Sequence, residues 1–301
     1  MTVTERLLRW GLGLAWAAVP FTVWPAIGDA LHGESDPLRI TAAAGAWAVW
    51  AVVLIAPLVP HPLGLTALRC VTPASLVAVV LAVGLGRGHV PVLTLALALG
   101  WAAIVVTAAF LPLTGVIFVN GPAYPNERRY LLGVPGALLL GPVELAWCGV
   151  AGLPTAAALL LAARQWVLGG VCSVLAVAAV WVLGRALYRL TRRWVVFVPA
   201  GLVLHDAASL AEPVLFRRQV IDSLGPAAAD SDSLDLTQRA LGLALELQLT
   251  EKVEMSRITP QHRGGEAGAS ARLLFTPTRP GMVLAEAATR RIRVGLPQSS
   301  S

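Results

Sequence analysis

The sequence predicts an α-helical membrane bundle of about six spans, followed by a C-terminal α+β domain of antiparallel β-strands closed by one helix. Two observations predict this fold class. The chain is 56% hydrophobic and 13% charged, with a mean hydropathy of +0.72, whereas ordinary soluble domains are about 25% charged. The apolar excess ends at Thr191-Arg192-Arg193, after which apolar residues alternate as they do in strands. We therefore expect a transmembrane domain at 1–190 and a cytoplasmic β-rich domain at 191–301.

The membrane half contains six stretches long enough to cross a bilayer, because a spanning helix needs about 20 apolar residues. They lie near 8–28, 40–60, 66–86, 90–111, 131–152 and 166–187. The segment 153–165 leaves two alternatives open: a short interfacial helix, or an extension of the sixth span.

Arginine placement predicts the orientation, because short loops rich in Lys and Arg stay in the cytoplasm. The strongest cluster closes the sixth span and consists of Arg185, Arg189, Arg192 and Arg193. We therefore expect a multi-pass protein of the inner (plasma) membrane with both termini in the cytoplasm. Arg87 and Arg164 would then lie outside, against the rule.

Short strands follow the arginine cluster. The segments 194–198 and 202–205 flank a turn at Pro199-Ala200-Gly201, and 214–216 begins another strand. The segments 234–237 and 243–249 predict a hairpin, with Glu246 and Gln248 facing solvent opposite a row of leucines. We expect a loop at 259–270, a last strand at 271–276, and a closing helix from Pro280 that ends at Gly295.

This arrangement resembles the bacterial pleckstrin-homology-like membrane proteins, over residues 185–295. The resemblance rests on Tyr188-Arg189-Leu190-Thr191, which leads into the first strand pair, and on Phe216-Arg217-Arg218-Gln219-Val220-Ile221. The membrane half resembles uncharacterised actinobacterial multi-span proteins, which supply no activity to transfer. The resemblance implies a pleckstrin-homology-like fold for the C-terminal domain.

A headgroup site is not expected at the first hairpin. Pleckstrin-homology domains that bind phosphoinositides place several Lys and Arg there, because a polyphosphate needs several charge-assisted hydrogen bonds. The turn at 198–202 carries no basic residue. We therefore expect a face that docks a protein partner, with Trp194, Arg217 and Arg218 as docking residues. The competing interpretation of Arg217 and Arg218 is a pair of solvated edge-strand charges.

The densest polar segment of the membrane half is a loop between the fourth and fifth spans. Two prolines and a glycine forbid a regular helix there, so we expect a shaped loop at the cytoplasmic surface. Its polar residues are expected to dock the C-terminal domain, to bind lipid phosphates, or to act only as a turn with positive-inside anchors: Asn120, Tyr124, Asn126, Glu127, Arg128 and Arg129.

Glu144 is the one acidic residue within a predicted span. A carboxylate in hydrocarbon is costly and marks either a polar path or a bond to a neighbouring helix. It supports an alternative function, a small-solute or proton-coupled carrier that uses Glu144 as its intramembrane polar site.

Several other classes of function lack support in the sequence. Arginine and acids nearly balance after residue 191, and no basic stripe with interleaved aromatics indicates nucleic-acid binding. Cys70, Cys148 and Cys172 form no metal-binding spacing, so no metal or cofactor is expected. Neither a phosphate-binding loop nor a hydrolase motif occurs. The leading hypothesis is therefore a non-enzymatic, membrane-anchored docking or regulatory module, in contact with lipid and a cytoplasmic protein partner, in cell-envelope assembly.

Overall fold

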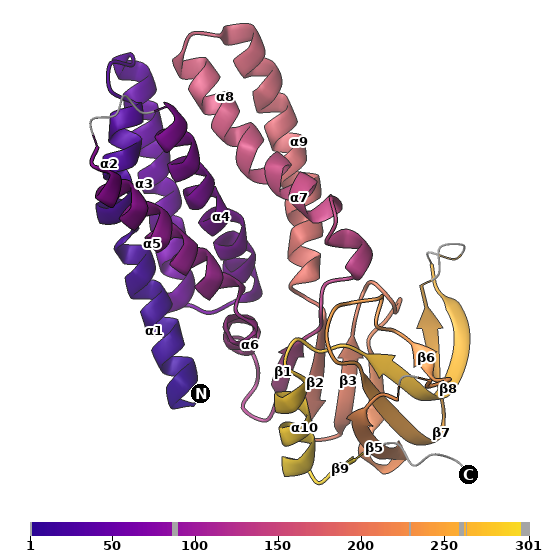
Figure 1. Ribbon diagram of the computed structural model, residues 1–301. Helices are drawn as coiled ribbons and strands as arrows, with labels where there is room; N and C mark the ends of the chain where they lie inside the picture. The colour runs from indigo at the N-terminus through magenta and orange to yellow at the C-terminus, as the bar shows by residue number, and fades with distance from the viewer. Residues whose placement is uncertain (1, 86–89, 229, 259–261, 263, 296–301) are drawn as a thin grey trace. The chain divides into compact units, whose positions relative to one another are not determined.

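The computed structural model of the chain describes residues 2–295 apart from 86–89, 229, 259–261 and 263 (Figure 1). The chain divides into two compact units. The helical unit comprises Met1–Gly121 and Val143–Tyr188, and the sheet unit comprises Pro122–Pro142 and Arg189–Ser301. The segment Pro122–Pro142 therefore joins the C-terminal residues, although the sequence placed it in the transmembrane domain.

Six helices in the described part of the chain are long and apolar enough to cross a membrane, which confirms the predicted class of protein. They are Val3–Ala30, Asp36–Leu58 (α3), Pro62–Leu85 (α4), Val92–Phe110 (α5), Pro142–Ala162 and Trp166–Leu190 (α9). The first comprises α1 (Val3–Ala17) and α2 (Val19–Ala30), and the fifth comprises α7 (Pro142–Trp147), a π-helical turn (Cys148–Gly152) and α8 (Leu153–Ala162). A short helix, α6 (Pro112–Asn120), follows α5.

The break between α1 and α2 is explained by Pro20, which has no N–H to donate to the carbonyl of Trp16 four residues earlier. The indole Nε1 of Trp50 donates to that carbonyl at 3.1 Å, and Trp16 Nε1 donates back to the Trp50 carbonyl at 2.9 Å. Trp101 Nε1 donates to the Ala15 carbonyl at 2.9 Å. Neighbouring helices thus satisfy carbonyls at the break, as lipid-embedded backbone requires.

The fifth span was predicted at 131–152, and the structure corrects it to Pro142–Ala162. The apolar residues at the start of the predicted span form a strand instead, β1 (Arg128–Leu131). Pro135 and the glycines around it then prevent an α-helix, and only a short 3-10 helix, Gly136–Leu138, forms before Pro142. The segment 153–165 is neither of the two expected alternatives, because most of it is α8, the second half of the fifth span.

The sheet unit contains two sheets, one of four strands and one of five. The first has the order β1-β2-β3-β4 and is antiparallel throughout, with β2 at Trp194–Val198, β3 at Gly201–His205 and β4 at Val214–Arg217. The second has the order β6-β8-β7-β5-β9. Its strands are β5 (Ile221–Pro226), β6 (Leu234–Asp235), β7 (Leu245–Arg257), β8 (Glu266–Phe275) and β9 (Arg293–Val294).

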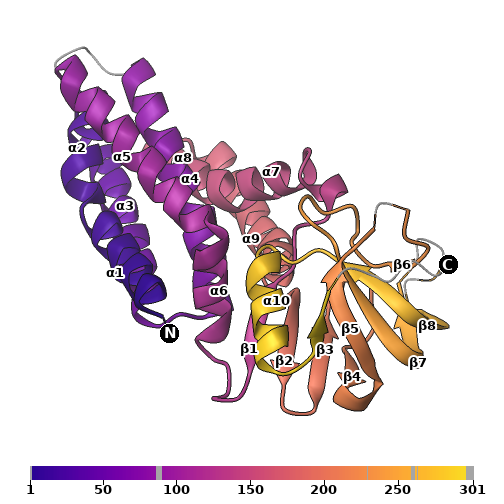
Figure 2. The same cartoon turned by 60° about the horizontal axis from the view of Figure 1, so that its bottom comes forward.

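One helix, α10 (Pro280–Thr289), completes the sheet unit. Figure 2 shows α10 beside β1 and β2, and the Tyr130 hydroxyl of β1 lies 3.5 Å from a carboxylate oxygen of Glu286 on this helix. The expected sheet-rich domain with antiparallel strands and a helix is therefore present. Neither sheet closes into a barrel within the described residues, and the pleckstrin-homology-like fold stays a prediction.

The core of the sheet unit comes from alternate residues of its strands. Phe197, Leu202 and Phe216 are fully buried in the first sheet. Leu245, Leu247 and Leu273 are fully buried in the second, and Val283 and Ala287 from α10 are also fully buried. Burial of a large apolar side chain contributes about 1.5–3 kcal/mol, so these residues account for much of the stability of the unit.

The predicted hairpin of 234–237 with 243–249 is wrong. β6 pairs with β8 in parallel, and β7 lies between β8 and β5. Glu246 is buried, contrary to the solvent-facing position expected for it. The hydroxyls of Ser231 and Ser233 donate to its carboxylate at 3.2 and 2.9 Å, so the loop before β6 covers that face of β7.

The last strand and the closing helix also have different bounds from those predicted. β8 begins at Glu266, within the expected loop at 259–270, part of which lies outside the described residues. α10 ends at Thr289 and does not reach Gly295. Arg291 adopts a left-handed φ of 58°, and the amides of Arg291 and Ile292 donate to the carbonyls of Ala288 and Ala287. This is a Schellman motif, which ends a helix; here arginine takes the position that glycine usually occupies.

Candidate functional site

A basic cleft forms in the sheet unit around the turn between β2 and β3. It has a volume of about 380 Å³. Three arginines line it together with the turn and the end of α10: Val198, Pro199, Gly201, Arg218, Thr289, Arg290, Arg291 and Ile292. We call this site the arginine cleft. The turn itself has no basic residue, as the sequence indicated, but Arg218, Arg290 and Arg291 reach it from distant parts of the chain.

Two of these arginines are held in place by hydrogen bonds. Arg218 donates through Nη1 to the carbonyl of Arg290 and through Nη2 to the carbonyl of Arg291, the latter at 2.6 Å. Arg290 donates through Nε to Glu286 at 2.7 Å and through Nη2 to the carbonyl of Asn126 at 3.0 Å. Arg218 is half-buried, whereas Arg291 is exposed. Arg218 therefore presents an ordered positive charge to the cleft, whereas the charge of Arg290 is paired with Glu286.

Gly201 is required at the edge of the cleft. Its φ is 148°, and a Cβ at this position would lie 2.0 Å from the carbonyl oxygen of Phe216. No other residue fits without moving β4. The missing Cβ at Gly201 therefore lets β4 pair closely with β3, and the amide of Arg218, directly after β4, donates to the Ala200 carbonyl of the turn at 2.9 Å.

Of the predicted docking residues, Arg218 lines the cleft, Arg217 is exposed at the end of edge strand β4, and Trp194 is buried in β2. The Trp194 ring lies between the guanidinium of Arg129, at 5.3 Å, and the ring of His205, at 5.4 Å. Trp194 therefore packs within the sheet unit. The sequence missed Arg290 and Arg291, because the end of α10 was predicted too late in the chain.

The predicted polar loop is divided between the two units. Asn120 ends α6 and donates to the carbonyl of Val116 at 2.8 Å in the helical unit. The rest of the loop belongs to the sheet unit, where Arg128 and Arg129 begin β1 and pair with β2. Glu127 forms an ion pair with Arg129 at 2.9 Å.

Tyr124 and Asn126 are the remaining predicted residues of this loop. Tyr124 is exposed, and the Asn126 carbonyl accepts from Arg290. The loop is thus bound to its own unit through strand pairing and through the arginine that lines the cleft. Sequence patterns gave no sign of this, because β1 lies more than 60 residues before its partner β2.

Glu144 lies in the first turn of the fifth span and is exposed, not at the middle of the span as the predicted bounds implied. The shift follows from the corrected start of the helix at Pro142. A carboxylate in the first turn of a helix interacts favourably with the helix dipole. This position agrees better with the membrane–water interface than with a polar path through the hydrocarbon.

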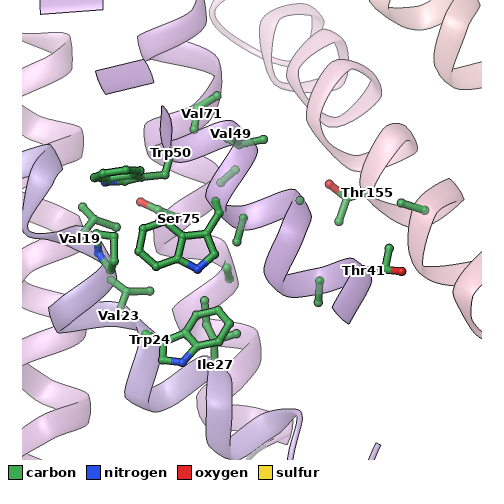
Figure 3. Close-up of a pocket in the computed structure, with 18 of the residues that line it drawn as sticks. Val19, Val23, Trp24, Ile27, Thr41, Val49, Trp50, Val71, Ser75 and Thr155 are labelled. Carbon is green, nitrogen blue, oxygen red and sulfur yellow. The ribbon is translucent and has the colours of Figure 1, made fainter. Parts of the chain in front are cut away.

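A second hollow lies within the helical unit and has a volume of about 450 Å³. Residues of α1, α2, α3, α4 and α8 line it, and Figure 3 shows Val19, Val23 and Trp50 on one side and Thr41 and Thr155 on the other. None of its lining residues is charged, and Glu144 is not among them. We call this hollow the membrane cavity.

No group of three His, Cys, Asp or Glu residues suited to a metal ion occurs in the described parts of the chain. The three cysteines are unpaired thiols. No family model, curated protein or solved structure matches this chain.

Proposed function

We propose that the chain is a non-enzymatic integral membrane protein whose sheet unit docks an acidic segment of a protein partner at the cytoplasmic face. The arginine cleft is the observation that carries this proposal. In this interpretation the six spans anchor the sheet unit at the inner (plasma) membrane as a docking or regulatory module. Cell-envelope assembly is the setting that we propose for this module.

The fixed positions of the arginine side chains in the cleft support binding to carboxylates. Guanidinium groups form strong, charge-assisted hydrogen bonds with carboxylates, and Arg218 and Arg290 are already fixed by carbonyls and by Glu286. A site with ordered side chains loses less conformational entropy on binding. Arg291 is exposed beside them. Among the described residues its side chain forms no hydrogen bond or ion pair that would hold the fold together.

The test is co-purification of the full chain from native membranes, with quantitative identification of bound proteins. We expect a specific partner with wild type that is lost with Arg291→Glu. The matched control is Arg272→Glu, which reverses the charge of an exposed arginine on β8, away from the residues of the cleft. Partners retained equally by both variants would overturn the proposal. Loss of co-purified anionic phospholipid alone would also overturn it, in favour of a lipid headgroup.

The alternative, a small-solute or proton-coupled carrier that uses Glu144, has weaker support. Carrier sites lie near the middle of the bilayer at broken helices. The broken helices are present, at Pro20 in the first span and at the π-helical turn before Pro154 in the fifth. Glu144, however, lies at the end of its span and does not line the membrane cavity.

A further inference from the structure

The membrane cavity lies in one half of the helical unit. It is lined by the second half of the first span, from Trp16 to Ile27, and by the first half of the second span, from Thr41 to Trp50. Successive spans run in opposite directions, so these segments are at the same depth. Residues 154–159 of the fifth span also line it. The cavity is therefore in the leaflet opposite the N-terminus.

Trp16 and Trp50 line the end of the cavity nearest the middle of the spans. Trp16 is the middle residue of the first span, and the two reciprocal indole–carbonyl bonds at 2.9 and 3.1 Å fix both rings between α1 and α3. Beyond this pair α2 begins at Val19, with Pro20 in its first turn. From there on residues of α2 and α3 line the cavity, so the space between these two helices lies in this leaflet.

Small residues keep the space open. α3 contributes Ala42, Gly45 and Ala46 to the lining, and α4 contributes Ala74 and Ala78. Small residues in membrane helices usually let two backbones pack closely. Here a Cβ added at Gly45 would meet no atom within 4 Å, and Gly45 is exposed, so this part of α3 has no close neighbour among the described residues and the cavity is open on this side. A molecule from outside the chain is needed to fill it.

The lining determines the chemistry of that molecule. All the lining side chains are uncharged, and the polar ones that carry hydroxyls are Thr41, Ser75 and Thr155. The Ser75 hydroxyl donates to the Thr72 carbonyl at 2.6 Å, and the Thr155 hydroxyl donates to the Ala151 carbonyl at 2.8 Å. Those two oxygens can then only accept. An ion or a strongly polar solute would lose its hydration without compensation.

We propose that the membrane cavity binds a single uncharged apolar chain, at most bearing a hydroxyl that donates to Ser75 or Thr155. Its volume of about 450 Å³ lies in the range of about 300–1,000 Å³ that small-molecule sites occupy. Such a chain has two sources, the acyl chain of a phospholipid or a separate long-chain alcohol. Both reach the cavity laterally from the leaflet opposite the termini.

The test uses the full chain in nanodiscs of dioleoylphosphatidylcholine. One arm contains a trace of phospholipid with a diazirine in one acyl chain, and the other contains a long-chain alcohol with the same group. After illumination, labelled peptides are mapped. We expect labelling concentrated on 41–50 and 154–159, and reduced by an excess of the unlabelled alcohol. The probe that labels these segments, phospholipid or long-chain alcohol, identifies the source of the apolar chain.

The variant Gly45→Leu fills the cavity, and Gly100→Leu on α5 is its matched control because a Cβ there also meets nothing within 4 Å. Gly100 does not line the cavity. We expect Gly45→Leu to reduce labelling about tenfold, which corresponds to about 1.4 kcal/mol of binding free energy. Gly100→Leu should leave it unchanged. Labelling spread evenly over lipid-facing helices and insensitive to competitor would overturn the proposal, even if Gly45→Leu does not fold.

Discussion

Arg193 and Asp206 form a buried ion pair that joins the start of β2 to the residue after β3. Arg193 donates through Nε and Nη2 to the two carboxylate oxygens, at 2.5 and 2.8 Å, and both side chains are almost fully buried. Arg193 Nη1 also donates to the Gly133 carbonyl at 2.7 Å, and Ser209 donates to Asp206 at 2.6 Å. The network therefore binds three separate segments of the sheet unit together.

The first prediction concerns the removal of this pair. Asp206→Asn leaves the Arg193 charge buried without a counter-ion, so the free energy of unfolding of the sheet unit should fall by about 3–5 kcal/mol. The control is Asp222→Asn, which removes the exposed pair with Arg293 and should cost about 0–1 kcal/mol. Native-state hydrogen exchange of the β2 and β3 amides in the full chain measures both. Equal losses of unfolding free energy in the two variants would show that the buried pair stabilises the unit no more than the exposed pair does.

The lowered pKa of Asp206 predicts how acidic the solution must become before the sheet unit loses the stabilisation from this residue. Burial alone would raise the pKa of Asp206, but its hydrogen bond with Arg193, the Arg193 charge, the Ser209 hydroxyl and the Ala208 amide outweigh burial and lower the pKa below 3.8. A carboxylate with a lowered folded pKa adds stability above its unfolded pKa and loses it as pH falls through the folded pKa. The stabilisation from Asp206 should thus persist at about pH 4 and disappear only in stronger acid.

The pKa of His205 predicts that the stability of the sheet unit also depends on pH near neutrality. Burial lowers the pKa of His205 below 6.5, the charges of Arg192 and Arg129 lower it further, and Asp206 opposes them. Between the folded and unfolded pKa values the unfolded state binds more protons, so stability falls as pH decreases below about 6.5. Hydrogen exchange of β3, corrected for intrinsic rates, should show this decline in wild type and a smaller one in His205→Phe. Identical pH profiles would contradict it.

Glu144→Gln should have little effect. Glu144 is exposed in the first turn of its span, where an acid contributes about 0.3–1 kcal/mol through the helix dipole. We expect a stability change within that range, and no change in proton or solute flux through liposomes that contain the protein. A flux that is present in wild type and abolished by Glu144→Gln would instead support the carrier.

The number of spans was predictable because hydrocarbon imposes a length of about 20 apolar residues on any helix. The bounds of the fifth span were not predictable from the sequence. Apolar residues such as Leu131 and Leu132 serve equally well in a membrane helix or in the core of a sheet, and composition alone does not separate the two. β1 pairs with a strand more than 60 residues later, and no local pattern reports such a pairing.

The arginine cleft was predictable only in part. Arg218 was identified as a candidate because it follows a strand pattern. Arg290 and Arg291 were missed because their position depends on where α10 ends, and the Schellman motif at Arg291 lacks the usual glycine signal. The membrane cavity had no sequence signal at all, since small residues such as Gly45 indicate close packing as readily as open space.

Topology can be tested with single cysteines, after replacement of Cys70, Cys148 and Cys172. We expect all six candidate spans in the described residues to cross, which predicts both ends on one side, and the arginines after the sixth span predict that this side is the cytoplasm. A membrane-impermeant maleimide should label Ser35→Cys in intact cells and should label Glu251→Cys only after lysis. Both positions are exposed. The reverse pattern would place the arginine cleft outside the cell and exclude a cytoplasmic partner.

The last prediction concerns the bond from Trp50 Nε1 to the Trp16 carbonyl, 3.1 Å long. This carbonyl lacks its usual helical partner only because residue 20 is proline. Trp50→Phe should therefore destabilise the helical unit by about 1 kcal/mol, which lies between the average of about 0.6 kcal/mol and the maximum of about 1.7 kcal/mol measured for hydrogen bonds between membrane helices. In the Pro20→Ala background the restored N–H can bond the same carbonyl, and Trp50→Phe should cost much less.

A double-mutant cycle of Pro20→Ala and Trp50→Phe, followed by unfolding in mixed micelles, measures this coupling directly. Trp166→Phe is the control, because Trp166 is 68% exposed and the substitution should change stability little in either background. An equal cost of Trp50→Phe in both backgrounds would mean that the indole acts through packing alone. The carbonyl of Trp16 at the break would then need another partner.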